Sequence, residues 1–459
     1  MATYPYFILG PNTLLSLFGL FYGADETETK AEKEWQDVTV DVVIPAFNEE
    51  KTIILCLQSL MRQTLKPHRI VLIDDGSTDK TSAIARAFSA ENGIDLEIIR
   101  HRTSVGKTPG VKQEAHELDG DVEFILDGDT VLKSENYLER VVQELYKGIG
   151  IASACGTIMP LRNNDRDEMA SVPEVKRFYD ANLDLDYTVD KEGWHHVMHI
   201  ITDQYREFLY FFLQHFVYRG QMAIFGSIVN PVGCAVAYRR EYIKDIFDQY
   251  EETLGDNLTT SEDIFIGFAL QNMGYHNVQV VDVLAQSQEP EAQSIPGQIF
   301  MWSSAFLQSC YYFPELLKSP FKFKQRKKYH KELEEDDRHN AHRKKEAYYE
   351  TIGVAHTKKY GRPIGWTILL GLLEKIMFPL MILMMITFQW WEALFVTIGC
   401  EMAVLLIVTA IISHKYKMNY VGDAILATPM RYVTLMFDLY TVARFVFEIT
   451  FVKNHEWRK

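Results

Sequence analysis

The chain has little cysteine for its length. Its 459 residues include five cysteines, at positions 56, 155, 234, 310 and 400. The number is odd and no two have a paired spacing, which indicates a reducing, cytosolic environment rather than a disulfide framework. No zinc site is implied.

Basic residues are also scarce, with 47 Lys and Arg against 62 Asp and Glu and a net charge of -15. A nucleic acid partner is excluded because phosphate contact needs a basic face, and no basic stripe with interleaved aromatics occurs. The N-terminus lacks the basic region of a signal peptide. Its apolar stretch, residues 4–22, is broken by Gly10-Pro11-Asn12. We expect this stretch to be interfacial or re-entrant, with a membrane span as the alternative.

Long hydrophobic runs are found near the C-terminus. Residues 366–388 and 394–413 are each about long enough to cross a bilayer, and QWWEA between them predicts a hairpin with aromatic anchors. Basic KKYGR and HKYK flank the hairpin and place both of its ends in the cytosol. Glu374, Lys375 and Glu401 lie within these runs, so we expect those faces to pack on protein rather than lipid.

A third apolar segment, residues 428–451, contains four charged residues: Arg431, Asp438, Arg444 and Glu448. It either crosses the bilayer or lies in the interface.

The preceding part of the chain alternates strands with helices. Apolar runs of strand length occur at residues 38–44, 70–73, 95–101 and 122–126, and helices are predicted from about Glu49 and over residues 80–90. This alternation predicts an α/β fold with parallel strands. The loops PAFNEE, DDGSTD and DGDT follow three of the strands and should meet at one edge of the sheet.

The triplet Asp-Gly-Asp occurs twice around the fourth strand, at residues 119–121 and 127–129. Ligands gather at the carboxyl ends of strands, so the first copy predicts a turn and the second a functional site. Asp127 and Asp129 can aim oxygens at one hard cation, such as magnesium or manganese, which takes its other ligands from phosphates.

These motifs, together with SEDIF and QIFMW further on, resemble the inverting family-2 glycosyltransferases over about residues 38–302. Among them, the chain is most similar to the membrane-integrated synthases of hyaluronan, chitin and cellulose. The resemblance implies a GT-A nucleotide-sugar domain with a doubly wound mixed sheet, interfacial helices and a C-terminal helical membrane bundle. The expected division is 1–35 for an N-terminal segment and linker, 36–295 for the GT-A domain, 296–362 for an interfacial helix and charged segment, and 363–459 for the membrane helices.

The resemblance also implies roles for individual residues. Asp75 would contact the base of a nucleotide sugar, whose site would consist of Ala46, Glu49, Asp75, Lys107, Asp127 and Gln298. Asp129 would bind the divalent metal, Mg²⁺ or Mn²⁺. Asp263, beside Glu262, would be the catalytic base. The acceptor sugar would contact Gly233, Cys234 and Trp302.

Simpler explanations exist for some of these residues. Glu262 and Asp263 also fit the first turn of a capped helix that ends at Gly274. The three histidines His195, His196 and His199 have a spacing that a helix could use for a metal, but no partner carboxylate is obvious, so we interpret them as solvated or packed side chains.

One position departs from the family. The synthases resemble one another in a Gln-x-x-Arg-Trp motif, and here Met301 stands at the arginine position between Gln298 and Trp302. In those synthases the arginine helps to hold the diphosphate of the donor. Methionine cannot donate a hydrogen bond to phosphate. Either another cation, such as Arg239, Arg240 or a lysine of the charged segment, substitutes for the arginine, or the protein differs in processivity.

Three functions follow from these patterns. The first is metal-dependent, inverting transfer from a UDP-sugar to a growing β-linked polysaccharide by a membrane protein with a cytosolic catalytic domain. The second is non-processive transfer to a lipid or lipid-linked acceptor. The third is an inactive membrane scaffold of the same fold. The expected partners also include the lipid bilayer and a second copy of the chain that would complete a pore.

Overall fold

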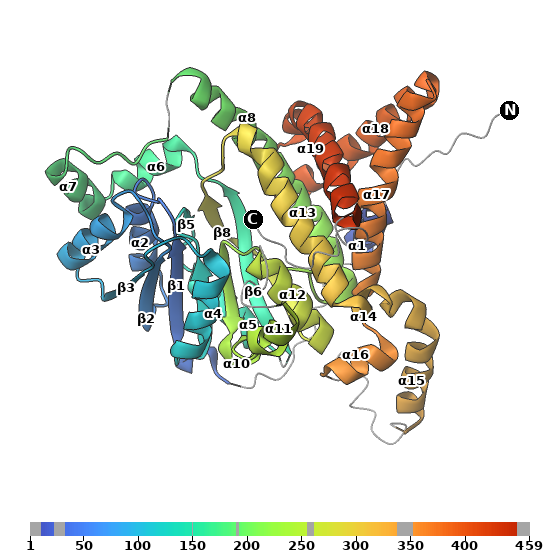
Figure 1. Ribbon diagram of the computed structural model, residues 1–459, viewed down its shortest axis with the longest axis horizontal. Helices are drawn as coiled ribbons and strands as arrows, with labels where there is room; N and C mark the ends of the chain where they lie inside the picture. The colour runs from blue at the N-terminus through green and yellow to red at the C-terminus, as the bar shows by residue number, and fades with distance from the viewer. Residues whose placement is uncertain are drawn as a thin grey trace.

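The structure is a computed structural model that describes residues 11–22, 33–148, 150–189, 192–254, 261–336 and 352–447. It contains a sheet flanked by helices and, beside it, a bundle of long helices (Figure 1).

The described strands form one sheet with the order β3-β2-β1-β4-β7-β6-β8-β5. Their bounds are β1 Val40–Ala46, β2 Arg69–Asp74, β3 Leu96–Arg100, β4 Val122–Leu126, β5 Thr130–Leu132, β6 Ile151–Pro160, β7 Ala235–Arg239 and β8 His276–Ser287. The first four strands are parallel to one another, whereas β7 runs antiparallel to both β4 and β6. The predicted α/β class with a mixed sheet is confirmed.

The helices of the sheet domain cover both faces of the sheet. One buried apolar cluster joins the sheet to α2 (Ile53–Met61), α3 (Thr81–Asn92) and α5 (Tyr137–Leu145). A second joins it to α4 (Lys107–Glu117), α11 (Ile246–Leu254) and α12 (Glu262–Met273). Because β1 and β4 lie between these layers, their residues are almost all buried, which explains their nearly continuous apolar sequence.

The other helices connect this domain to the bundle or belong to the bundle. They are α1 Pro11–Tyr22, η1 Trp35–Asp37, α6 Asn163–Ala170, α7 Pro173–Ala181, α8 Gly193–Phe212, the π-helix η2 Leu213–Tyr218, α9 Arg219–Phe225, α10 Arg240–Ile243, η3 Ala292–Ser294, α13 Ile295–Tyr312, α14 Pro314–Leu317, η4 Ser319–Lys322, α15 Phe323–Asp336, α16 Val354–Tyr360, α17 Gly365–Thr387, α18 Trp391–Tyr416 and α19 Val421–Phe447.

Helices α8 and α13 lie between the sheet and the bundle (Figure 1), and both contact α19. Phe208 of α8, Ile299 of α13 and Leu405 of α18 belong to one buried apolar cluster. The bundle is therefore attached to the sheet domain through a shared apolar core.

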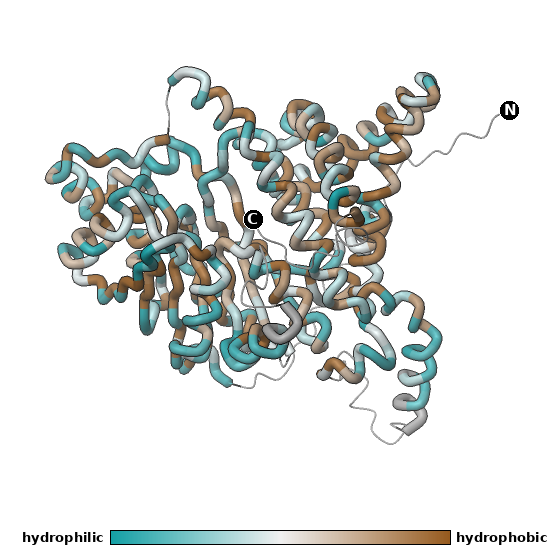
Figure 2. Tube along the Cα trace, viewed as in Figure 1, coloured by the Kyte–Doolittle hydropathy of each residue, from teal (hydrophilic) through white to brown (hydrophobic). Residues whose placement is uncertain are grey.

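Two helices of the described chain are long and apolar enough to cross a membrane, α17 with 23 residues and a mean hydropathy of 2.1 and α18 with 26 residues and 2.4. They coincide with the two predicted spans, and Figure 2 shows hydrophobic residues along both. Lys375 Nζ lies 2.8 Å from Asp438 Oδ1, and Glu401 pairs with Arg431. These contacts confirm that the side chains of Lys375 and Glu401 pack on protein.

Two other predicted segments are described in part. Residues 11–22 form α1, which lies against α9 and α17, and residues 4–10 lie outside the described chain. With 12 residues, α1 alone is shorter than a membrane span. Of the third C-terminal segment, residues 428–447 belong to α19, and Glu448 lies outside the described residues.

Candidate active site

A cavity of about 910 Å³ lies where β4 ends and β7 begins. We call it the acidic cavity because carboxylates outnumber lysines in its lining. The lysines are Lys107 and Lys375, and the five carboxylates are those of Asp127, Asp129, Glu262, Asp263 and Glu289. It brings together nine of the residues expected in the site: Lys107, Asp127, Asp129, Gly233, Cys234, Glu262, Asp263, Gln298 and Trp302.

The second Asp-Gly-Asp triplet is fixed between two strands. The Asp127 backbone N–H donates to the carbonyl of Cys234 (2.9 Å), and the Gly128 N–H donates to Pro45 (3.0 Å). A Cβ at position 128 would lie 2.9 Å from the Ala46 Cβ, so glycine permits this close approach. The triplet thus directs Asp127 and Asp129 into the cavity.

The first triplet lies at the opposite edge of the sheet, before β4. Its Gly120 N–H donates to the Asp41 carboxylate at 2.8 Å. Asp41, His68 and Asp119 have ligand atoms within 4.8 Å of one another and could hold a metal ion. This cluster lies at the start of β1, away from the loops that follow the strands, and is not part of the acidic cavity.

Lys107, the first residue of α4, forms ion pairs with acids from two parts of the chain, the loop after β4 and helix α12. Its Nζ lies 2.7 Å from Asp127 Oδ1 and 2.5 Å from Glu262 Oε1, and it donates to the Gly233 carbonyl at 3.2 Å. Burial raises the pKa of Asp127 to about 6 and that of Glu262 to about 7, although Lys107 acts in the opposite direction on both. The charge of Lys107 therefore does not offset the effect of burial on these two carboxylates.

Asp129 and Glu49 add to this excess of negative charge. Asp129 Oδ1 accepts hydrogen bonds from the hydroxyls of Thr130 (2.9 Å) and Ser287 (3.3 Å). Burial, together with the charges of Asp129 and Asp127, raises the pKa of Glu49 to about 9. Clustered carboxylate oxygens that raise one another's pKa fit a hard divalent cation such as Mg²⁺ or Mn²⁺.

Asp263 lies in the first turn of α12. The predicted helix is confirmed, and it ends at Gly274 with a φ of 95°. Asp263 Oδ1 accepts hydrogen bonds from the Ile264 N–H (2.8 Å) and the Ser261 hydroxyl. A Cβ at position 233 would lie 2.6 Å from the Asp263 carboxylate, so Gly233 leaves the room that this carboxylate occupies.

Ala46, Glu49 and Asp75 do not line the acidic cavity. Asp75 instead accepts hydrogen bonds from the Ser104 hydroxyl (2.6 Å), the Val105 and Gly106 N–H groups (both 2.9 Å) and contacts His101 Nδ1 at 2.9 Å. Burial favours a higher pKa for Asp75, but these hydrogen bonds outweigh it and lower the pKa. In this structure Asp75 holds the loop that leads to Lys107.

The expectation that Arg239 or Arg240 substitutes for the arginine missing at position 301 is wrong. Arg239 donates to the Leu145 carbonyl at 2.9 Å, and Arg240 donates to the Gly120 carbonyl at 3.1 Å. Because β7 runs antiparallel to β4, its last residue pairs with Val122 at the edge opposite the cavity. The reversal of this strand was not visible in the sequence motifs.

Three charged residues near the cavity were not assigned to the site from the sequence. The guanidinium of Arg206 lies 4.7 Å from the centre of the Trp302 ring, Glu289 follows β8, and Lys375 reaches the cavity from α17. The available sequence signal for Arg206 was an arginine within the aromatic stretch YREFLYFF, and the structure buries it. The three histidines considered as metal ligands, His195, His196 and His199, lie outside the metal-sized cluster found among the described residues, and His195 Nδ1 lies 2.9 Å from Glu291.

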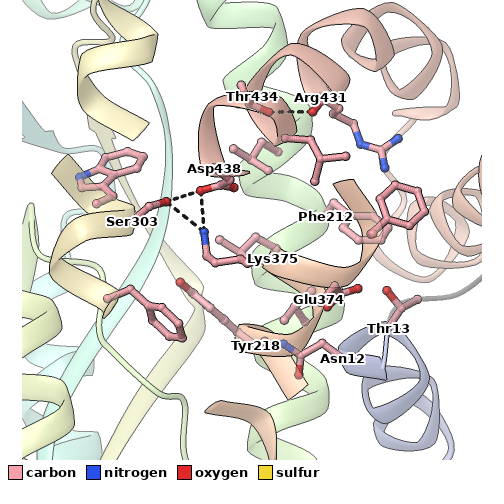
Figure 3. Close-up of a pocket in the computed structure, with 18 of the residues that line it drawn as sticks. Asn12, Thr13, Phe212, Tyr218, Ser303, Glu374, Lys375, Arg431, Thr434 and Asp438 are labelled. Carbon is pink, nitrogen blue, oxygen red and sulfur yellow. Dashed lines mark hydrogen bonds and ion pairs between the residues drawn. The ribbon is translucent and has the colours of Figure 1, made fainter. Parts of the chain in front are cut away.

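A second cavity of about 620 Å³, which we call the bundle cavity, is lined by α8, α13, α17, α18 and α19. Tyr210, Tyr218, Asn230, Trp302 and Lys375 line both cavities, so the two adjoin at these residues. Figure 3 shows Lys375 between Ser303 and Asp438. The bundle cavity is lined by three cations and three carboxylates: Arg206, Lys375, Arg431, Glu374, Glu401 and Asp438.

Comparison with known proteins finds a matching family model and several relatives. Residues 41–247 match the family model "Glycosyl transferase family 2". An N-acetylglucosaminyltransferase of Azorhizobium caulinodans is 25% identical over 261 residues, which cover 55% of each chain. A dodecaprenyl-phosphate galacturonate synthase of Rhizobium johnstonii is 30% identical over 97 residues, 20% of this chain and 29% of that protein. The chain thus spans about half the length, or less, of these curated relatives.

Among solved structures, the mannosyltransferase PcManGT of Pyrobaculum calidifontis, in complex with GDP-Man and Mn²⁺, is 13% identical with a TM-score of 0.48. The similarity covers 96% of this chain and 94% of that one.

Proposed function

We propose that this chain, whose residues 41–247 match the family model "Glycosyl transferase family 2", is a membrane-bound inverting hexosyltransferase that extends a β-linked polysaccharide from a UDP-sugar. The observation that carries the proposal is the acidic cavity, in which Lys107, Asp127, Asp129 and Asp263 lie together beside Trp302. The two apolar helices α17 and α18 support its placement in a membrane. The basic residues that flank them, in KKYGR and HKYK, favour a cytosolic position for the sheet domain.

The proposed reaction is a single displacement. A hydroxyl oxygen of the acceptor forms a bond to the anomeric carbon of the donor while the bond from that carbon to the diphosphate oxygen breaks. Asp263 takes the proton of the hydroxyl as general base. The configuration at the anomeric carbon is inverted because attack and departure occur on opposite faces.

Asp129 and Asp127 are the residues that would hold Mg²⁺ or Mn²⁺, which when bound stabilises negative charge on the leaving diphosphate. Lys107 lies between Asp127 and Glu262 and would orient both carboxylates. The nucleoside of the donor would lie beside Glu49 and Asp75, outside the acidic cavity. Gly233 and Cys234 would lie beneath the terminal acceptor sugar, next to Trp302.

The bundle cavity supports a polysaccharide acceptor. It adjoins the acidic cavity at Trp302 and Lys375, so a chain held at the site has space to continue between the helices. Its cations face an equal number of carboxylates. Such a lining offers hydrogen bonds without a large net charge, which suits the hydroxyl groups of a glycan.

A lipid-linked acceptor is the second candidate. Met301 lines the acidic cavity where processive synthases carry an arginine, and two long apolar helices are few for a channel within one chain. One relative of the domain is named as a dodecaprenyl-phosphate galacturonate synthase. The inactive scaffold is less well supported, since the metal-binding and base positions all carry carboxylates.

The test is release of UDP by the purified protein in nanodiscs, over a panel of UDP-sugars with Mg²⁺ or Mn²⁺. We expect turnover with one donor, loss of turnover with EDTA, and a ladder of polymeric product on a gel. A single lipid-soluble product would support the second candidate. No turnover and no binding of UDP would contradict the proposal and favour the scaffold.

A further inference from the structure

Trp302 follows Met301, the residue at the arginine position of the synthase motif. Met301 and Trp302 are consecutive residues of α13, and both line the acidic cavity. Trp302 also lines the bundle cavity, so its ring stands in the wall between the two. A side chain in this position needs support if it is to present a fixed surface to a sugar.

Arg206 provides a cation at this wall from a different helix. It extends from α8, and its guanidinium carbon lies 4.7 Å from the centre of the Trp302 ring. Only 2% of Arg206 is exposed. A cation–π contact is stronger when the cation is removed from water, so this contact holds the indole more firmly than one at the surface.

Two further contacts fix the guanidinium itself. Arg206 donates a hydrogen bond to Gln298 Oε1, one turn before Trp302 on α13. Its Nε lies 3.5 Å from the Glu289 carboxylate, which also accepts a hydrogen bond from the Tyr210 hydroxyl at 2.7 Å. Arg206 thus joins α8, α13 and the loop after β8 around one aromatic ring.

The position of Arg206 also argues against a role in binding the diphosphate. It lines the bundle cavity and is absent from the lining of the acidic cavity, where Lys107 and Lys375 are the cations. The Glu289 carboxylate lies 3.5 Å from its Nε. A role in binding the diphosphate is therefore not supported by its location.

We propose that Arg206 is a positioning residue that holds Trp302 and Gln298 in the wall between the cavities, and so acts on the acceptor rather than on the nucleotide. The inference rests on the proposed glycosyltransferase function. The cation that contacts Trp302 comes from α8.

The test compares Arg206→Met, Arg206→Lys and Arg206→Met/Glu289→Gln, the last of which removes both partners of the buried ion pair. Arg162→Met is the matched control, because Arg162 pairs with Glu207, the α8 residue next to Arg206, and its side chain is 46% exposed. Near-ultraviolet circular dichroism of each variant, with and without Trp302→Phe, isolates the signal of Trp302. UDP release and UDP binding with Mn²⁺ are measured on the same samples.

We expect Arg206→Met and the double variant to lose the Trp302 signal and to transfer sugar about tenfold more slowly, the size of effect given by one desolvated cation–π contact. UDP binding should stay within about twofold of the wild type, and Arg206→Lys should retain part of both properties. The Arg162→Met control should match the wild type in all of them.

A folded double variant with an unchanged Trp302 signal and unchanged transfer would overturn the proposal. So would a loss of UDP binding as large as the loss of transfer. If the wild type turns over no UDP-sugar, the proposed function fails, and the Trp302 signal alone still decides whether Arg206 positions the ring.

Discussion

The acidic cavity and the bundle cavity adjoin, yet their charges are arranged differently. Five carboxylates face two lysines in the first, whereas three carboxylates face three cations in the second. In the bundle cavity Lys375 pairs with Asp438, and Arg431 pairs with Glu401. In the acidic cavity the acids outnumber their partners, and burial raises the pKa of Glu262 to about 7.

This difference separates two uses of charged residues. A bound cation reduces the repulsion among carboxylates that are in excess, and such a cation suits chemistry on a diphosphate. Paired charges supply hydrogen-bond donors and acceptors with little net charge, which suits packing and contact with hydroxyl groups. Variants of each cavity should therefore fail in different ways.

The largest effect is expected for Asp263→Asn. An amide cannot take a proton from the acceptor hydroxyl, so turnover should fall by about 10² to 10⁴-fold, while UDP still binds. UDP release under saturating donor measures the loss. Asp282→Asn is the control, because Asp282 is an exposed acid paired with Arg140 on the surface. Normal turnover of Asp263→Asn would remove this residue from the chemistry.

Gly233→Ala should have the next largest effect. The added Cβ would lie 2.6 Å from the Asp263 carboxylate and must displace it. A displacement of this kind can cost up to about 100-fold in kcat/KM. Gly297→Ala is the matched control, since a Cβ there meets no atom within 4 Å. Equal activity of the two variants would show that the position of Asp263 is unimportant.

A smaller effect is expected in the bundle cavity from Lys375→Met, which leaves Asp438 without its cation. The pair is about a quarter exposed, so the loss of unfolding free energy should be about 1–2 kcal/mol. Thermal unfolding in nanodiscs measures the change. Lys375→Met/Asp438→Asn should regain most of the loss. If the double variant is less stable than the single one, the two side chains do not compensate each other.

The smallest predicted effect is a dependence of stability on pH. Glu262 has its pKa raised to about 7, mainly by burial, so the folded protein keeps a proton that the unfolded chain releases above about pH 4.5. Its contribution to stability is therefore present at low pH and decreases as pH rises from about 4.5 to 7. Glu262→Gln should flatten the dependence of the melting temperature on pH over this range. A dependence as steep in Glu262→Gln as in the wild type would contradict the prediction.

The sequence was informative where the signal is local. The strands before PAFNEE, DDGSTD and DGDT are where they were expected, because each apolar run and the loop after it are adjacent in the chain. Helix α12 and its end at Gly274 were also predicted. The helix predicted from about Glu49 is α2, which begins at Ile53, since residues 47–52 form turns and bends between β1 and this helix.

Contacts between distant elements could not be predicted in this way. Arg206 and Trp302 meet because the arginine side chain of α8 reaches α13, and no motif records that contact. Arg239 lies far from the cavity because β7 runs antiparallel to β4. Asp75 was expected at the base, yet its oxygens bind the loop before α4.

The most direct measurement is the location of Mn²⁺ by its anomalous scattering in crystals grown with UDP and MnCl₂. We expect one strong peak in the acidic cavity, bound to Asp129 and next to UDP, and loss of that peak in Asp129→Asn. A peak at Asp41, His68 and Asp119 with none in the acidic cavity would contradict the assignment of the catalytic metal, and with it the proposed use of the excess acid.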